Sequence, residues 1–287
     1  MCSPEIHKLV QKRIEREGAP QMSRRSLLRL GGLTAAGLAV ASTGLTTPRR
    51  ARAQMMSGTV MDLSHVFSVE GPTYLLGEGP ARETQVSVEN DGFYIQRWTL
   101  GEHTGTHMDI PAHFIADGET VDNYPVDLYF SPAVVIDISA KAADNPDATL
   151  DLADIEAWEA ANGEIPAGAL VCMYSGWDQY WDTAEDFRNA DADGVMHFPG
   201  FSGEAASFLV AERDIHGIAV DTLSLDNGPS ATFDVHYAIL GAGKYGIENV
   251  ANLGALIGHS ATIMVGVPRW QGGSGGPCRA MAMVEEM

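Results

Sequence analysis

The chain has 287 residues, 45% of them hydrophobic, and carries 38 acidic against 18 basic side chains for a net charge of −20. This length and composition supply enough apolar surface for a large core, which excludes a mostly disordered chain. The acidic excess repels phosphate backbones and anionic lipid head groups, so we expect neither nucleic acid nor a membrane surface as a partner.

Residues 1–53 have the pattern of an export signal. The run SRRSLLRLGG places Arg24 and Arg25 before a mildly apolar stretch at residues 30–45, and an A-x-A follows at Ala51 and Ala53. This order is typical of a twin-arginine signal peptide. We expect cleavage after Ala53, a folded domain over residues 54–287, and export to the periplasm or the medium. The alternative is an uncleaved membrane anchor, although the apolar stretch is short for a bilayer span.

Removal of the signal would make the chain more acidic. Residues 1–53 hold 10 of the 18 basic side chains and 3 of the 38 acidic ones, which leaves 8 basic and 35 acidic side chains, a net charge of −27, on residues 54–287. We therefore expect no stable membrane association after cleavage.

The remaining chain alternates between strand-like and helix-like segments. Helices are expected at residues 151–162, with Asp151 as N-cap, and at residues 202–213, with Ser202 as N-cap. The pattern predicts an α/β or α+β fold in a single domain. Strands are expected where β-branched and aromatic runs are bounded by Gly, Pro or Asp, at residues 59–66, 83–89, 92–100, 133–139, 169–175, 217–225, 260–267 and 279–285.

The densest group of candidate functional residues is EHTGTHMDIPAH, residues 102–113. On a straight strand His103, His107 and Asp109 would share a face, but the two histidines would stand about 13 Å apart. The Thr, Gly and Pro residues in the run argue against a helix. We therefore expect a bend at Gly105, where the missing Cβ lets the chain fold back so that both imidazoles converge.

This arrangement suits a metal site. Two neutral imidazoles and a carboxylate fit Zn²⁺ or Mn²⁺ and leave positions open for water and substrate, as in catalytic sites. His113 follows Pro111 by one short turn and could ligate the ion or carry protons beside it. The alternative is a polar loop whose histidines only form hydrogen bonds.

Further candidate ligands lie in DVHYAILGAGKYGIENVANL, residues 234–253, which holds His236 and Glu248. The GAGKYG between them matches G-x-G-x-x-G, but no strand-turn precedes it and no acidic residue follows about twenty positions on, as a dinucleotide site requires. We interpret it as a tight turn that returns Glu248 toward His236. A structural role for both residues is the alternative.

A second reaction class is suggested by GGSGG, residues 272–276, which fits G-x-S-x-G with Ser274 as a nucleophile. That motif needs a helix after the serine and an acid and a histidine later in the chain. Here Pro277 and a strand-like run follow, and the last histidine is His259. We therefore interpret the glycines as a loop, or as a place where backbone approaches the site.

The run HTGTHMDIPAH resembles the H-x-G-T-H-x-D-x-P-x-H signature of the cyclase family of metal-dependent hydrolases, which includes bacterial kynurenine formamidase and isatin hydrolase. DLSH at residues 62–65, VDTLSLD at residues 220–226 and the segment from His236 to Glu248 extend the resemblance over most of residues 60–284. It implies a mixed central sheet flanked by helices, of the swivelling β/α type, and a homo-oligomer, either a dimer or a tetramer.

The resemblance also implies a role for each motif residue. One or two ions, Zn²⁺ or Mn²⁺, are expected per subunit, with His113 as the general acid and base. The implied ligands are His103 and His107 for a first ion, Asp109 as a bridge to a second where two are present, His236 for the second, and Glu248 touching both.

The substrate side departs from the family pattern. Bacterial kynurenine formamidases have a tryptophan followed by Pro-Gly-Asp near the N-terminus, where this chain reads GPTYLLGEGP, so Tyr74 is the expected aromatic wall. The expected reaction is cleavage of an aryl formamide, or of a cyclic amide such as isatin, by activated water. The alternatives are a lactone or other cyclic ester hydrolase, and a periplasmic metal- or ligand-binding protein without catalysis.

No chemical role is expected for Cys172, Cys278 or a further group of acidic, aromatic and histidine residues. Cys172 and Cys278 are expected as two separate buried thiols, with a disulfide as the alternative. Structural roles are expected for Asp221, Asp226, Trp177, Trp181, His65, His197, His216 and His259.

Overall fold

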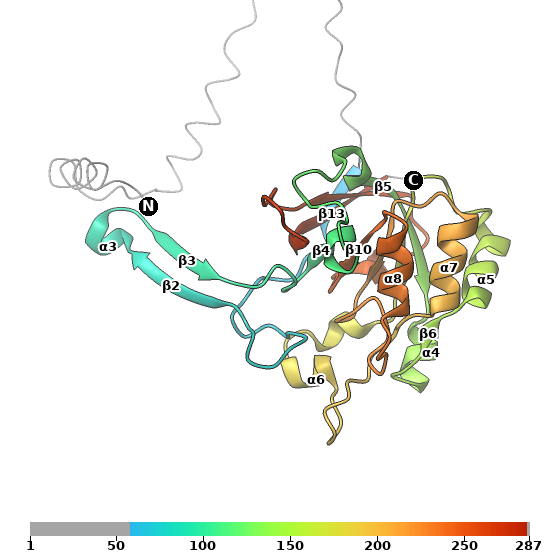
Figure 1. Cartoon of the computed structure of the whole chain (residues 1–287), viewed down its shortest axis with the longest axis horizontal. Coiled ribbons are helices and arrows are strands. Elements are labelled where there is room, and N and C mark those ends of the chain that lie inside the picture. Colours follow the sequence, from blue (N-terminus) through green and yellow to red (C-terminus); the bar gives the residue numbers. More distant parts are fainter. Residues whose placement is uncertain (1–57, 286–287) are drawn as a thin grey trace, which may run out of the picture. The chain divides into compact units, whose positions relative to one another are not determined.

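The computed structural model describes residues 58–285 and divides them into two units, one of residues 58–81 and 99–285 and one of Arg82–Trp98 (Figure 1). The expected signal peptide, residues 1–53, lies outside the described residues. Within residues 58–285, no helix is both long enough and apolar enough to cross a bilayer.

The larger unit is built on one nine-stranded mixed sheet. Its middle strands β5, β7, β9 and β10 are parallel, and the pairs outside them are antiparallel. The order across the sheet is β1 (Gly58–Asp62), β13 (Arg279–Glu285), β11 (Ala261–Gly266), β5 (Phe130–Asp137), β7 (Leu170–Tyr174), β9 (Gly217–Val220), β10 (Tyr245–Glu248), β4 (His107–Asp109) and β12 (Gly275–Pro277).

Helices and short turns of helix join these strands. Three of the helices, α5, α7 and α8, lie side by side with α7 in the middle (Figure 1). The helices are α4 (Ser139–Asp144), α5 (Leu152–Asn162), α6 (Ala184–Arg188), α7 (Gly203–Glu212) and α8 (Asp234–Gly241), and the 3-10 turns are η1 (Pro111–His113), η2 (Val126–Tyr129), η3 (Trp177–Tyr180) and η4 (Leu253–Leu256). A separate two-stranded sheet pairs β6 (Thr149–Leu150) with β8 (Gly200–Phe201).

Both faces of the central strands are buried, so β7 reads as the continuous apolar run LVCMY. Successive side chains of a strand point to opposite faces. Val171 and Met173 accordingly pack in one core cluster with residues of α5, α7 and α8, whereas Leu170 and Cys172 pack in a second cluster on the other face. The predicted mixed α/β fold with a central sheet flanked by helices is therefore confirmed.

Both expected helix starts are confirmed. The Ser202 hydroxyl accepts a hydrogen bond from the Ala205 amide, and the Asp154 carboxylate accepts one from the amide of the N-cap Asp151. Cys172 and Cys278 are free thiols, as expected, but only Cys172 is buried, whereas Cys278 is partly exposed.

The smaller unit is a hairpin of β2 (Ala81–Val86) and β3 (Ile95–Thr99). The prediction of continuous strands at residues 83–89 and 92–100 was wrong at the turn, where the short helix α3 (Val88–Asp91) intervenes. The Ser87 hydroxyl accepts a hydrogen bond from the Asn90 amide at its start, and Gly92 ends it at φ 79°, which glycine adopts without strain. A contact between the two strands joins the Arg82 guanidinium to the Trp98 ring, whose centre lies 5.5 Å away.

Candidate metal centre

Strand pairing brings three of the predicted ligands to one face of the sheet. In the antiparallel pair of β4 and β10, Glu248 lies directly opposite His107, and Gly246 lies opposite Asp109. Side chains at directly opposite positions share a face, and residues two apart on a strand share it too. His107, Asp109 and Glu248 therefore converge, and all three are buried, with exposed fractions of 3%, 0% and 6%.

The predicted bend at Gly105 is present. Gly105 has φ 68°, in the left-handed region, and a Cβ there would lie 2.8 Å from the Phe67 ring. The turn brings the His103 and His107 rings to 5.4 Å between centroids. The His103 Nδ1 lies 2.6 Å from the Asp109 Oδ1.

His236 reaches the same cluster from α8. Its Nε2 lies 3.2 Å from the Glu248 Oε1 and 3.5 Å from the Asp109 Oδ2. Its other ring nitrogen, Nδ1, lies 2.6 Å from the Asp226 Oδ2, and Asp226 also accepts hydrogen bonds from two backbone amides at the start of α8. A carboxylate on the far nitrogen fixes the orientation of a ligating histidine. Asp226, for which a structural role was expected, therefore also orients His236.

The cluster fits a divalent cation. The His107 Nε2 and the Asp109 Oδ2 are buried and have no hydrogen-bond partner, although the His107 Nε2 lies 3.3 Å from carboxylate oxygens of both Asp109 and Glu248. Unpaired buried polar atoms are rare, and imidazole nitrogen with carboxylate oxygen is the donor set of zinc and manganese sites. Two groups of side chains have ligand atoms close enough together to share an ion, namely His103, Asp109 and His113, and His107, Asp109 and Glu248.

The charges of the cluster agree with this assignment. Burial by itself would lower the pKa of His107, but the Asp109 and Glu248 carboxylates raise that pKa to about 10. Burial likewise opposes the charge of Asp109, but His107 and the neighbouring histidines hold its pKa well below the usual range. Without an ion the carboxylates are thus balanced by protons on imidazoles. A divalent cation would replace those protons, because metal ligands must be deprotonated.

His113 stands beside the cluster on η1. Its ring stacks on the His103 ring at 3.6 Å between centroids. Burial lowers the pKa of His113 to about 4, so its imidazole is neutral at pH 7 and has a free lone pair. A neutral imidazole next to an ion site can accept a proton from water and return it to a leaving group.

Two residues that the sequence analysis did not connect with the site lie on the other side of His103. The Ser274 hydroxyl lies 2.9 Å from the His103 Nε2 and 2.6 Å from the Glu102 carboxylate, to which the Ser274 amide also donates. The glycines after Ser274 belong to β12, which pairs with β4, so the expected loop was wrong at these positions and the alternative, a close approach of backbone to the site, is confirmed. A Cβ at Gly275 would lie 2.2 Å from the Met108 carbonyl oxygen, so only glycine lets β12 approach the site.

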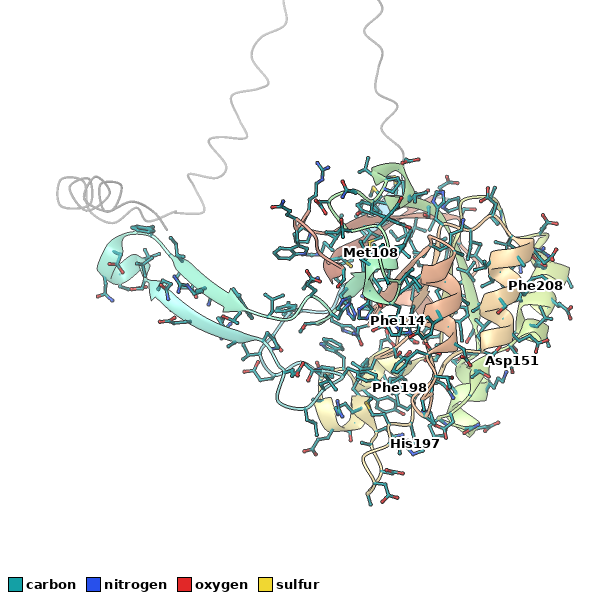
Figure 2. All side chains as sticks on the ribbon, viewed as in Figure 1. Met108, Phe114, Asp151, His197, Phe198 and Phe208 are labelled. Atoms are coloured by element: carbon teal, nitrogen blue, oxygen red, sulfur yellow. The ribbon has the colours of Figure 1, made fainter. Side chains whose placement is uncertain are left out.

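A cavity of about 390 Å³ opens onto the cluster. Phe114 lies beside α8 (Figure 2), with its ring stacked on His236 at 4.5 Å and 5.5 Å from the Phe233 ring. Tyr74, the predicted aromatic wall, also lines the cavity, 6.3 Å from Phe233. Among the described residues that line it, none is lysine or arginine, whereas Glu78, Glu102 and Glu248 are acidic.

Apart from Asp226, the residues that were expected to have structural roles make contacts away from the cavity. His65 stacks on Trp181 at 4.0 Å, His216 contacts the Ser131 hydroxyl, and His197 pairs with Asp147. The carboxylate of Asp221 accepts hydrogen bonds from two backbone amides and the Ser175 hydroxyl. None of these residues lines the cavity.

Both the sequence and the fold of this chain are similar to those of known proteins. Residues 61–227 match the sequence model of the Cyclase family. An isatin hydrolase from Roseibium aggregatum is 33% identical over 252 residues, which cover 81% of this chain and 95% of the relative. The structure of isatin hydrolase A from Ralstonia solanacearum is 34% identical with a TM-score of 0.77, covering 85% of this chain and 100% of the other. An isatin hydrolase bound to the product analogue thioisatinate is 28% identical with a TM-score of 0.76, covering 92% and 100%.

The buried imidazole and carboxylate cluster, at the end of an aromatic cavity on this fold, defines the class of the protein as a metal-dependent hydrolase. The match to the family model covers more than half of the chain. The similarity to the isatin hydrolase from Roseibium aggregatum covers four fifths of it. The chain belongs to the cyclase family.

Proposed function

We propose that this protein is an exported amidohydrolase that opens a cyclic aryl amide of the isatin type with a Zn²⁺ or Mn²⁺ ion. The observation that carries the proposal is the pair of unpartnered buried ligand atoms, the His107 Nε2 and the Asp109 Oδ2, at the end of a cavity walled by aromatic rings. The similarity to isatin hydrolases supports the choice of substrate.

The residues that would hold the ion are those of the cluster. His103, His107 and Asp109 would supply donors, and His236 and Glu248 lie close enough to Asp109 and to each other to add further donors, so the cluster could hold one or two ions. When bound, such an ion polarises a carbonyl oxygen and lowers the pKa of bound water.

The side chains of the cavity supply binding and proton transfer. Tyr74, Phe114 and Phe233 bind the aromatic ring of the substrate and exclude bulk water. Hydrolysis adds water to the carbonyl carbon and breaks the C–N bond, which leaves a carboxylate and an arylamine. The neutral His113 ring takes the proton from water and passes it to the leaving nitrogen.

The charge of the cavity selects among amides. Glu78 and Glu102 are acidic and no lysine or arginine lines the cavity among the described residues, so an anionic group that lies away from the metal donors meets no basic side chain there. A neutral ring such as isatin avoids this cost.

A substrate screen tests the proposal. The protein loaded with Mn²⁺ or Zn²⁺ is assayed against isatin, isatin-5-sulfonate, N-formylaniline and small lactones, with metal content measured on the same samples. We expect the highest kcat/KM with isatin and a lower value with the sulfonate, because the sulfonate adds an unpaired negative charge. Turnover of none of these compounds by fully metal-loaded protein would contradict the proposal and favour a binding protein.

A nucleophilic serine is the second candidate mechanism, because one contact favours it. Ser274, His103 and Asp109 are linked in the order of a serine hydrolase triad, with separations of 2.9 Å and 2.6 Å. Against it, Asp109 is shared with His107 and His236, and the Ser274 hydroxyl is held by Glu102. The element that directly follows Ser274 is the strand β12 and not the helix that a nucleophilic serine of this type requires.

Replacement of Ser274 by alanine separates the two mechanisms. We expect Ser274→Ala to retain its metal and to keep kcat within about tenfold of the wild type, whereas loss of a serine nucleophile costs about 10⁶-fold in kcat. Steady-state kinetics of the metal-loaded variant give the answer. A loss on the larger scale with full metal content would establish the serine mechanism.

Export and assembly into a homo-oligomer are further parts of the proposal. The paired arginines Arg24 and Arg25 and the A-x-A at Ala51 and Ala53 support transport to the periplasm. Membership in the cyclase family supports a homodimer or a homotetramer. N-terminal sequencing of the exported protein, followed by mass measurement in solution, tests both.

A further inference from the structure

The segment that carries Tyr74 forms one side of the cavity. Residues 72–78 contribute Pro72, Thr73, Tyr74, Leu75 and Glu78 to the lining. Two hydrogen bonds within the segment join the Thr73 hydroxyl to the Leu75 carbonyl and the Glu78 amide to the same carbonyl. These bonds shape the segment but do not fix it to the rest of the domain.

Arg188 connects residues 72–78 to the rest of the domain. From the last position of α6, its Nη1 donates hydrogen bonds to the carbonyl oxygens of both Thr73 and Tyr74. Burial lowers the pKa of Arg188, and within residues 58–285 no carboxylate lies within ion-pair distance of it. Burial of a guanidinium without an acidic partner costs free energy unless its N–H groups donate hydrogen bonds to other acceptors. Arg188 donates to the two carbonyl oxygens.

The backbone that carries Arg188 is well packed. Phe187, the preceding residue, is fully buried in a cluster with Trp177 and Phe198, and its carbonyl accepts a hydrogen bond from the Trp177 indole. The Tyr74 ring packs against the same cluster from the cavity side. Arg188 and the cluster therefore hold Tyr74 from two directions, one through its backbone and one through its ring.

We propose that Arg188 is a positioning residue that sets substrate selectivity by holding the Tyr74 wall at a fixed distance from Phe233. The proposal rests on the proposed function, since it assigns the wall to an aromatic substrate. Arg188 touches neither the metal ligands nor the cavity, so its loss changes how tightly a ring is bound and leaves the bond-breaking groups in place.

The test compares Arg188→Ala and Arg188→Lys with the wild type. We expect Arg188→Ala to raise KM for isatin about tenfold or more while kcat stays within about twofold, the pattern of lost ground-state binding. Lysine retains a donor, so Arg188→Lys should recover part of the affinity. A substrate without an aromatic ring, such as a small lactone, should show no change in kcat/KM.

A matched control and a second readout keep the test decisive. Arg213 makes a two-bond ion pair with Glu159 and lies outside the cavity lining, so Arg213→Ala controls for the general loss of an anchored arginine. Hydrogen exchange of residues 72–78 should rise in Arg188→Ala and stay unchanged in Arg213→Ala. Affinity for thioisatinate, measured by calorimetry, should fall in the first variant alone.

The possible outcomes are distinct. Unchanged exchange in residues 72–78, an unchanged thioisatinate affinity, or an equal rise in KM in Arg213→Ala would overturn the role of Arg188. If the wild type cleaves no aryl amide, the proposed function fails, but hydrogen exchange still decides whether Arg188 positions the Tyr74 segment.

Discussion

Replacement of Asp109 by alanine is expected to abolish metal binding and, with it, hydrolysis. Asp109 is fully buried, and its two oxygens face His103, His107 and His236 at 2.6 to 3.5 Å. Asp109 thus contacts all three imidazoles, whereas Glu248 contacts only His107 and His236, and removing Asp109 takes away much of the negative charge that attracts a cation. Elemental analysis of the purified variant should find less than about a tenth of the wild-type metal content.

A control separates loss of the ion from loss of the fold. Asp147 pairs with His197 at 2.9 Å on the surface, outside the cavity, so Asp147→Ala should retain full metal content and turnover. Circular dichroism shows whether Asp109→Ala is folded. A folded Asp109→Ala protein that binds metal and hydrolyses isatin as the wild type does would rule out the cluster as the metal centre.

Replacement of His113 by alanine is expected to leave the metal bound but to slow turnover by about two to four orders of magnitude, the usual contribution of a general acid and base. The His113 ring stacks on His103 rather than lying between the two carboxylates, so its removal does not take away the charges that attract the ion. Because burial lowers its pKa to about 4, the His113 imidazole is unprotonated at neutral pH and has a lone pair that can accept a proton. Steady-state kinetics at matched metal content measure the effect.

Two results would contradict this role for His113. Turnover unchanged in a metal-loaded His113→Ala protein would remove it from the reaction. Loss of the metal together with turnover would make it a ligand, as the close grouping of His103, Asp109 and His113 would allow. His259→Ala, at an exposed position, serves as the control and should behave as the wild type.

The local part of the site could be predicted from the sequence because it depends on local geometry. A glycine between two histidines permits a left-handed turn, and residues two apart on a strand share a face, so the convergence of His103, His107 and Asp109 needs no knowledge of the rest of the chain. The return of Glu248 toward His236 was also predicted, although as a tight turn. The structure places α8 before that turn and β10 after it.

The remaining contacts could not be predicted because they depend on sheet topology. The approach of Ser274 to His103 requires β12 to pair with β4, two segments more than 160 residues apart in the chain. Asp226 was close to His236 in sequence, but only the start of α8 turns its carboxylate toward the Nδ1 of that ring. The hydrogen bonds of Arg188 to the Tyr74 segment, likewise, join residues more than 110 positions apart.

The central claim is that the cluster around Asp109 holds a divalent ion on which hydrolysis depends. The most direct measurement is the rate of isatin hydrolysis by protein freed of metal with a chelator and then titrated with Mn²⁺ or Zn²⁺. We expect no turnover in the metal-free protein and a rate that rises with added metal until about one or two equivalents per chain are bound. Full turnover by protein shown to be free of metal would contradict the central claim and would direct attention to Ser274.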